Sequence, residues 1–348
     1  MKPLFHSDLD EILDLSREDL LALRGARIFI TGGTGFFGKW IVESLMHARE
    51  RLLGGKLEIT VLTRSRANAR TVFEGAFDLD QVHWHEGEIA SFSFPSGSFS
   101  HVIHAATPAR ASINDNDPLR MLEITISGTR HILYFARQAQ SSRLLLTSSG
   151  AVYGAQSPDL YGVPESHPGF VDPLEPKNAY AVGKLVSEHF CTQFSSDKLA
   201  CLIARCFAFV GPGLPLDEHF AIGNFIGDAL AGRKITIKGD GTPYRSYLYP
   251  TDLIAQLLAI LVRGVSCRPY NVGHPQAFNL REIAEAVSAQ TNVGTEILGK
   301  PQPGARSVRY VPDLSRLQSE LGAVPRVNLS EAIRRTLAWH RHSDQKRK

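Results

Sequence analysis

The chain has 348 residues, 43% of them hydrophobic and 21% charged, which is an ordinary globular composition with enough length for one large core or two smaller ones. The formal charge of +3 is small and falls partly in the last residues, 340–348, so it gives no reason to expect a nucleic-acid partner. The four cysteines have no metal-binding spacing, and the N-terminus is acidic instead of basic and then apolar, so we expect a reduced, cytoplasmic protein without a metal site.

The first half of the chain predicts alternating strands and helices. Residues 8–23 carry leucines at helical spacing, so one or two helices are expected before the first strand. Strands are then expected at 27–31, 57–63, near 82, and at 101–106, 143–148 and 199–205, and helices from 36, across 118–138 and over 178–194. This alternation is typical of a parallel sheet with helices on both faces.

The second half has a mixed order. A proline-rich stretch without periodicity runs from Gly154 to Pro176. After Gly211 we expect short strands near Ile235 and Tyr270 and helices at 222–231, 252–263 and 279–290. None of the apolar runs is long enough to cross a bilayer, so no membrane span is expected.

We therefore predict an α/β fold, with a doubly wound parallel (Rossmann) sheet and a smaller mixed α/β C-terminal domain. The first domain is expected over residues 1–210, with a helical N-terminal extension over 1–25. The second is expected over 211–348, except that 240–265 returns to the first.

A glycine-rich turn follows the first strand. Glycines stand at three-residue spacing, Gly32, Gly35 and Gly38, and the helix expected from Phe36 carries Ile41, Val42 and Leu45. Gly32 permits a tight turn, Gly35 lets the backbone approach a pyrophosphate, and Gly38 lets helix and strand pack closely. This order predicts a nicotinamide dinucleotide site, the alternative being a glycine turn that binds nothing.

The end of the second strand bears on which dinucleotide binds. An acidic residue usually stands there and binds the ribose hydroxyls, but this chain has Thr63, Arg64, Ser65 and Arg66. The missing acid and the guanidinium favour a 2′-phosphate, and hence NADP over NAD. Alternatively, Arg64 and Arg66 are only solvated, or stack on the adenine of NAD.

A phenol and an ammonium stand four residues apart, at Tyr180 and Lys184, on one face of an expected helix. The ammonium, together with a positive nicotinamide, would lower the pKa of Tyr180, so that its phenolate could take a proton from a substrate hydroxyl. Such a pair is common on ordinary helices. It gains weight because an apolar strand ends nearby in the hydroxyls of Thr147, Ser148 and Ser149.

Six motifs occur here in a known order: TGGTGFFG (31–38), HAAT (104–107), SSGAVYG (148–154), YAVGK (180–184), GDGTPYRSYLY (239–249) and YNVG (270–273). From about residue 27 to 340 the chain resembles the extended short-chain dehydrogenases/reductases of the NAD(P)-dependent nucleotide-sugar epimerase/dehydratase family. The resemblance implies that Ser149 hydrogen-bonds the reacting hydroxyl, that Tyr180 is the base and that Lys184 tunes it.

The resemblance also implies two sets of binding residues. For the cofactor, NAD(P), these are Gly32, Thr34, Gly35, Phe36, Phe37, Gly38, Arg64, Glu88, Ile89, Ala105, Ala106, Thr107, Tyr180 and Lys184. For a nucleotide-diphosphate sugar they are Thr107, Ser149, Gly150, Asn224, Arg245 and Arg309. Asn224, Arg245 and Arg309 could instead have no ligand, Asn224 as a helix cap and the two arginines as ordinary surface residues. A homodimer through helices 118–138 and 178–196 is implied as well.

Three positions depart from the family pattern and leave the substrate open. Ala208 and Thr125 stand where the family has asparagines, and Ser246 stands where an acid usually follows the substrate arginine.

The residues after Ser149 bear on the reaction. Related 4,6-dehydratases have an aspartate-glutamate pair there, decarboxylases a glutamate at the second position and 3,5-epimerases a cysteine, whereas this chain has Gly150 and Ala151. A 4-epimerase needs only the triad, so we expect 4-epimerisation through transient oxidation at C4. Dehydration or decarboxylation would need another proton-transfer group, such as Glu165 or His167.

Two further alternatives stay open. One is an NADPH-dependent 4-keto nucleotide-sugar reductase, which suits Arg64. The other is a catalytically silent dinucleotide-binding protein.

Overall fold

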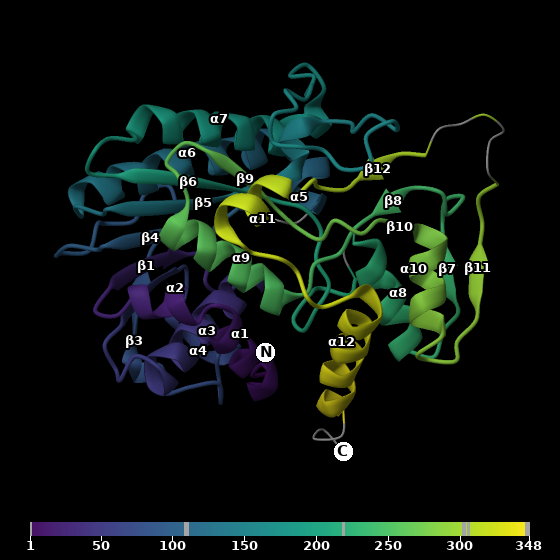
Figure 1. Cartoon of the computed structure of the whole chain (residues 1–348), viewed down its shortest axis with the longest axis horizontal. Coiled ribbons are helices and arrows are strands. Elements are labelled where there is room, and N and C mark those ends of the chain that lie inside the picture. Colours follow the sequence, from purple (N-terminus) through teal and green to yellow (C-terminus); the bar gives the residue numbers. More distant parts are fainter. Residues whose placement is uncertain (1, 108–110, 218–219, 301–303, 305–306, 345–348) are drawn as a thin grey trace.

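A seven-stranded parallel sheet with the order β3-β2-β1-β4-β5-β6-β9 forms the centre of the protein. The computed structural model describes residues 2–107, 111–217, 220–300, 304 and 307–344 (Figure 1). The strands are β1 (Arg27–Thr31), β2 (Glu58–Thr63), β3 (Val82–Glu86), β4 (His101–His104), β5 (Arg143–Ser149), β6 (Ala200–Cys206) and β9 (Pro269–Val272). The order reverses direction at β1 and β4, which is the topological switch point where ligands bind in doubly wound folds.

Alternating side chains divide the core between the two faces of the sheet. Ile28 and Ile30 of β1 and Leu145 of β5 belong to one buried cluster, while Phe29 and Leu144 belong to the other. This period of two lets each strand be apolar throughout and still serve both faces.

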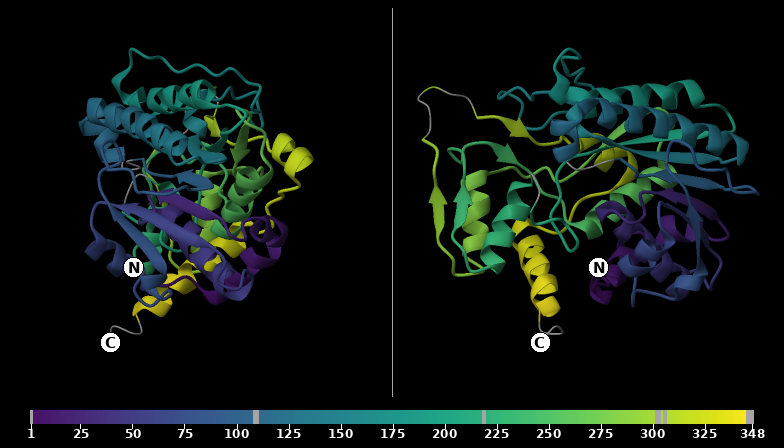
Figure 2. Two further views of the ribbon diagram at one scale, coloured as in Figure 1. Left: turned by 90° about the vertical axis from the view of Figure 1, so that its left-hand side faces the viewer. Right: turned by 180° about the vertical axis from the view of Figure 1, so that it is seen from behind.

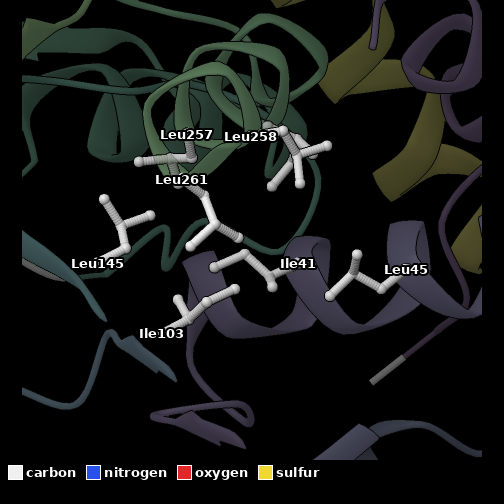
Figure 3. A pocket seen from close by; sticks show the side chains of 8 residues that line it. Ile41, Leu45, Ile103, Leu145, Leu257, Leu258 and Leu261 are labelled. Carbon is white, nitrogen blue, oxygen red and sulfur yellow. The ribbon is translucent and has the colours of Figure 1, made fainter. Parts of the chain in front are cut away.

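Helices cover both faces. One face packs against α6 (Pro118–Gln138) and α7 (Ala179–Phe194), which lie along each other (Figure 1). The other packs against α3 (Phe36–Arg51) and α9 (Pro250–Arg263), whose aliphatic side chains meet those of β4 and β5 around a small apolar void (Figure 3). The predicted α/β fold with a Rossmann sheet is therefore confirmed.

Most of the second half forms two small sheets beside the large one (Figure 1). One has the order β10-β8-β12, from β10 (Phe278–Asn279), β8 (Tyr244–Arg245) and β12 (Arg309–Tyr310), and the other pairs β11 (Thr295–Ile297) with β7 (Ile235–Ile237). Helices α8 (Ala221–Leu230) and α10 (Leu280–Ser288) pack on them. The strand at Tyr270, which we grouped with this half, is instead the seventh strand of the large sheet.

The N-terminal extension and the C-terminal helix lie side by side. The N-terminal extension forms α1 (His6–Leu15) and α2 (Arg17–Ala22), as its leucine spacing predicted. The indole Nε1 of Trp339 in α12 (Leu329–Asp344) donates a hydrogen bond to the Pro3 carbonyl at 3.0 Å, and all views place α12 beside the N-terminus (Figure 2). The extension thereby joins the sheet to the C-terminal helix.

The remaining helices are short: α4 (Arg66–Val72), α5 (Ala111–Asn116), α11 (Ser315–Leu321), and 3₁₀ turns at Leu79–Gln81, Gly150–Tyr153 and Pro176–Asn178. Among the described residues, no helix combines the length and apolar character that a bilayer span requires. The same residues contain no group of three or more metal-binding side chains, and the four cysteines are free thiols.

Candidate active site

The glycine turn lies at the carboxyl end of β1 and requires glycine at two positions. Gly32 has a φ of +72°, and a Cβ there would lie 2.6 Å from the Ala105 backbone. At Gly38 a Cβ would lie 2.1 Å from the Gly32 carbonyl oxygen. Both values are far below contact distance, so any side chain would open this turn. The turn therefore presents its backbone and the N-terminus of α3, an arrangement that suits a pyrophosphate.

A buried polar network fixes this turn relative to α6 and α7. The hydroxyl of Thr31, just before the turn, lies 2.8 Å from Nδ1 of His104, and it accepts a hydrogen bond from the Ala106 backbone N–H. His104 Nε2 lies 3.2 Å from the Thr129 hydroxyl, which lies 2.9 Å from that of Ser187. Burial lowers the pKa of His104 to about 3, so this ring is neutral. The motif that contains His104 thus joins β1, β4, α6 and α7.

Ser149, Tyr180 and Lys184 are brought together where β5 ends beside α7. The Lys184 ammonium donates hydrogen bonds to the Thr107 hydroxyl and to the Thr147 carbonyl, each at 2.7 Å. It also lies over the Tyr180 ring, 5.8 Å from its centre, and the Tyr180 hydroxyl interacts with that of Ser149. This arrangement can hold a hydroxyl-bearing ligand at Ser149 beside a phenol and an ammonium.

Burial dominates the pKa of Tyr180, for which we expect a lowering by Lys184 together with a positive nicotinamide. Burial raises it to about 12, and the Ser149 hydrogen bond opposes this only in part. The Lys184 ammonium makes its close contacts with Thr107 and Thr147 instead of the phenol oxygen, and burial lowers its own pKa to about 8. The sequence pattern placed the two groups together but did not reveal how deeply both are buried.

Two aromatic residues of this site were missed by the sequence analysis. The Tyr310 ring packs against that of Phe207, with 4.8 Å between centres. The Tyr310 hydroxyl interacts with Ser149, and it lies 2.8 Å from where a Cβ of Gly150 would be. Tyr310 stands in a strand of two residues, so no periodicity could identify it; its only signal was its place directly after Arg309.

The two expected substrate arginines lie on neighbouring strands. Pairing of β12 with β8 sets Arg309 opposite Tyr244 and Tyr310 opposite Arg245. The Arg309 guanidinium stacks on the rings of Tyr244 and Tyr161, 4.5 and 5.5 Å from their centres. Its Nε is buried without a hydrogen-bond partner among the described residues, so it retains a donor for a ligand.

Most of the remaining predicted positions follow strands of the large sheet, and Asn224 lies in the second half. Arg64 follows β2 and is exposed, with no hydrogen bond or ion pair to another residue that the structure describes. Glu88 and Ile89 follow β3, where the Glu88 carbonyl accepts backbone hydrogen bonds from Ser91 and Phe92. Asn224 is exposed in the first turn of α8. The other cofactor positions lie in the turn 32–38 and in the loop 105–107 after β4.

The three departures from the family pattern are buried or half-buried. The Thr125 hydroxyl bonds to the Met121 carbonyl within α6, at 2.8 Å. The Ala208 carbonyl accepts the Leu248 N–H at 3.0 Å. Ser246 is fully buried, and its hydroxyl has no partner among the described residues.

Glu165 and His167 serve the structure of the proline-rich stretch. A Glu165 carboxylate oxygen accepts a hydrogen bond from the Asn271 backbone N–H at 2.8 Å, and the other lies 3.8 Å from Nε of Arg316. The His167 ring packs near Tyr153, whose hydroxyl donates to the Asn271 amide oxygen at 2.8 Å. These contacts hold the stretch against β9.

Known proteins resemble this chain in sequence and in fold. The profile of the NAD dependent epimerase/dehydratase family matches residues 28–273. UDP-glucuronic acid decarboxylase 3 of Arabidopsis thaliana is 30% identical over 313 residues, which cover 88% of this chain and 86% of that protein.

Solved structures share the fold. The UDP-N-acetylglucosamine 4-epimerase of Methanobrevibacter ruminantium, in complex with UDP-N-acetylmuramic acid, superimposes with a TM-score of 0.78 at 20% identity, over 92% of this chain and 99% of that one. The dTDP-glucose 4,6-dehydratase of Streptomyces venezuelae, with NAD bound, gives a TM-score of 0.74 at 22% identity, over 92% and 98%.

Proposed function

Because the chain belongs to the NAD dependent epimerase/dehydratase family, we propose that it is a nucleotide-sugar 4-epimerase that acts by transient oxidation at C4 of the sugar. The observation that carries this choice is the pair Gly150 and Ala151 directly after Ser149. Neither residue can transfer a proton, and the space where a side chain at 150 would lie is filled by Phe207 and Tyr310. An epimerase needs no further acid or base there.

The residues of the first half fit a nicotinamide dinucleotide. The turn 32–38 excludes side chains and exposes a helix N-terminus, which supports pyrophosphate binding there. The loop of Ala105, Ala106 and Thr107 lies against it and reaches Lys184. When bound, the nicotinamide would accept hydride from C4 and later return it. We place the nucleotide sugar between this edge and the second half, with Asn224, Arg245 and Arg309 at its diphosphate.

The chain's own residues then divide the proton chemistry. Ser149 holds the C4 hydroxyl by a hydrogen bond, and Tyr180 takes its proton as C4 loses hydride. Lys184, held by Thr107 and Thr147 at 5.8 Å from the centre of the Tyr180 ring, supplies a positive charge that, together with a bound nicotinamide, would favour the phenolate. The 4-keto sugar then rotates and presents its opposite face to the nicotinamide. Tyr180 returns the proton as C4 regains hydride on that face, so the reaction has no net redox change.

Decarboxylation and dehydration are less well supported, although the Arabidopsis relative is a decarboxylase by name. Ala151 stands where a decarboxylase of the family would have a glutamate. Glu165 does not replace it easily, because its carboxylate is buried and bound to the Asn271 backbone.

Arg64 favours a second candidate, an NADPH-dependent 4-keto nucleotide-sugar reductase. It is exposed at the end of β2, where an acid would bind the ribose of NAD, and it has no ion-pair partner in the described part of the chain. We propose on the same ground that NADP binds better than NAD.

Product analysis separates these candidates. UDP-, dTDP-, GDP- and CDP-sugars would each be incubated with the purified protein, without added nicotinamide and then with NADPH. An epimerase gives a C4 epimer of unchanged mass without added reductant, provided that cofactor copurifies. Loss of water or carbon dioxide would refute 4-epimerisation, and product formed only from a 4-keto sugar with NADPH would identify a reductase.

We also propose a homodimer that is formed by α6 and α7. These helices pack along each other and expose apolar side chains, including Leu119 (64% exposed) and Leu185 (37%). Sedimentation of the wild type and of a Leu119→Glu, Leu185→Glu variant tests this. A wild type that sediments as a monomer would refute it.

A further inference from the structure

Tyr310 comes from the far end of the chain to the reaction centre. Its strand β12 pairs with β8 on one side, and an isolated bridge joins Arg309 to Gln156 on the other. The next residue is fixed as well, because the Val311 N–H donates to the Gln156 side chain and its carbonyl accepts from Val163, each at 2.9 Å. The backbone around Tyr310 is therefore held from two sides, so its side chain has a defined position.

The hydroxyl of Tyr310 is directed at the residues that follow β5. Its ring is half-buried against Phe207, and a buried phenol requires a polar partner. The polar side chains beside it are the Ser149 hydroxyl and, on the other side of that serine, the Tyr180 phenol. Gly150 leaves room for this arrangement, since a Cβ there would lie 2.8 Å from the Tyr310 oxygen and from the Phe207 ring. Two phenols thus meet at one serine.

We propose that the Tyr310 hydroxyl is a second catalytic group, a hydrogen-bond donor to the same sugar oxygen that Ser149 and Tyr180 bind. The assignment rests on the proposed function, because it places the reacting oxygen at Ser149. Burial raises the pKa of Tyr310 above its ordinary value, and, unlike Tyr180, Tyr310 has no ammonium over its ring among the described residues, so this phenol keeps its proton at neutral pH and acts as a donor only.

The two phenols then have different tasks. During oxidation the hydroxyl proton passes to Tyr180 and the C4 hydrogen leaves as hydride to the nicotinamide, while Tyr310 neither gains nor loses a proton. Its hydrogen bond strengthens as negative charge grows on the sugar oxygen, which lowers the barrier in both directions. The hydroxyl also closes the side of the site that Gly150 leaves open.

The test is Tyr310→Phe, which removes the hydroxyl and keeps the ring that packs on Phe207. Loss of one donor to a developing oxyanion costs about a hundredfold in rate, so kcat and the single-turnover rate of nicotinamide reduction should fall by about that factor. Sugar-nucleotide affinity should change by less than about threefold, since the donor acts mainly in the transition state. Tyr134→Phe removes an exposed hydroxyl from α6 and should match the wild type.

The pH profile identifies the task of Tyr310. If Tyr180 is the base, Tyr310→Phe lowers the plateau value of kcat in a plot of kcat against pH and leaves the fall of kcat at acid pH unchanged. Disappearance of that fall would make Tyr310 the base and overturn the assignment, as would a rate within twofold of the wild type or a loss confined to KM.

Hydride transfer keeps this test separate from the choice of reaction. The rate of hydride transfer can be measured for epimerisation and for 4-keto reduction alike. If the protein proves to be a reductase, the proposed epimerase function is refuted but the role of Tyr310 can still be tested. A wild type that transfers hydride to or from none of the sugars would overturn both.

Discussion

The Lys184 ammonium lies 2.7 Å from the Thr107 hydroxyl, so a residue of α7 is bound directly to the loop after β4. Thr107 is half-buried at the carboxyl edge of the sheet, near the backbone that approaches Gly32. The glycine turn and the surroundings of Lys184 therefore border the same loop, residues 105–107. The proposed proton transfer and the proposed cofactor site are parts of one constellation.

Tyr180→Phe should keep the fold and dinucleotide binding but reduce turnover by several orders of magnitude, because only the proton-transferring oxygen is removed. The measurements are kcat with the substrate found by product analysis and cofactor affinity by fluorescence titration. Turnover close to the wild-type value would remove Tyr180 from the mechanism.

Arg64→Ala should weaken NADP binding by about 1 to 3 kcal/mol and leave NAD binding nearly unchanged, since an exposed guanidinium can form charge-assisted hydrogen bonds to a 2′-phosphate. Calorimetric titration with both cofactors measures the difference. Arg70→Ala provides a control, because the guanidinium of Arg70, a residue of α4, already pairs with the Asp80 carboxylate at 3.1 Å. Equal losses for NAD and NADP would remove the basis for preferring NADP.

The sequence predicted the helices and strands better than it predicted which strands pair with one another. Helix 118–138 was found at its observed bounds, since its apolar period and the proline at its start are local signals. The strand at Tyr270 was found but grouped with the second half, because its pairing with β6 joins residues far apart in the chain. Local patterns identify a strand without identifying its neighbour.

The same limit explains what was missed in the site. Ser149, Tyr180 and Lys184 lie at motif spacings and are close together in the structure. Tyr310 reaches them only through the pairing of β12 with β8 and with the proline-rich stretch, which no spacing encodes. Burial, which sets the Tyr180 pKa, also depends on the whole fold.

Stability should fall in acid because of His104. Its pKa is about 3 in the native protein against 6.5 ordinarily, so between these values the unfolded chain binds a proton that the native state does not. The stabilising contribution is therefore complete above about pH 6.5 and is lost as the pH falls, at up to about 1.4 kcal/mol per unit. Urea unfolding between pH 4.5 and 7.5 measures this slope.

His104→Gln separates this contribution from other acid effects. The variant should lose about 1 to 3 kcal/mol at pH 7, because the buried hydroxyls of Thr31 and Thr129 each lose one of their partners, and its stability should depend less steeply on pH. Exposed His83→Gln should follow the wild-type curve. Parallel curves for wild type and His104→Gln would show that another group titrates.

Arg335 joins the two ends of the chain through three carboxylates. Its guanidinium lies 3.0 Å from Asp8 and also pairs with Glu11, both on α1, and with Glu331 on α12. Asp8 is only 2% exposed and accepts a further hydrogen bond from the Tyr249 hydroxyl at 2.7 Å. Because burial already raises the pKa of Asp8, its charge depends on this arginine.

Arg335→Met should therefore destabilise the protein by about 2 to 4 kcal/mol at pH 7.5, since it leaves the buried Asp8 carboxylate without its cation. Arg334→Met is the matched control: this neighbour is 63% exposed at its side chain, pairs only with Glu331 among the described residues, and should cost less than about 1 kcal/mol. Equal losses for the two variants would mean that Arg335 acts as an ordinary surface charge.

The pH dependence of Arg335→Met has a definite sign. Without the guanidinium the native pKa of Asp8 rises further above its unfolded value, so the native state binds the extra proton and stability falls as the pH rises. The difference from wild type should thus be smaller at pH 5 than at pH 7.5 in urea unfolding.

Asp8→Asn removes the uncompensated charge while keeping a hydrogen-bonding side chain for Tyr249. Added to Arg335→Met, it should restore part of the lost stability at pH 7.5 and little at pH 5. No restoration at either pH would mean that the loss comes from the packing of α12 and not from the Asp8 charge.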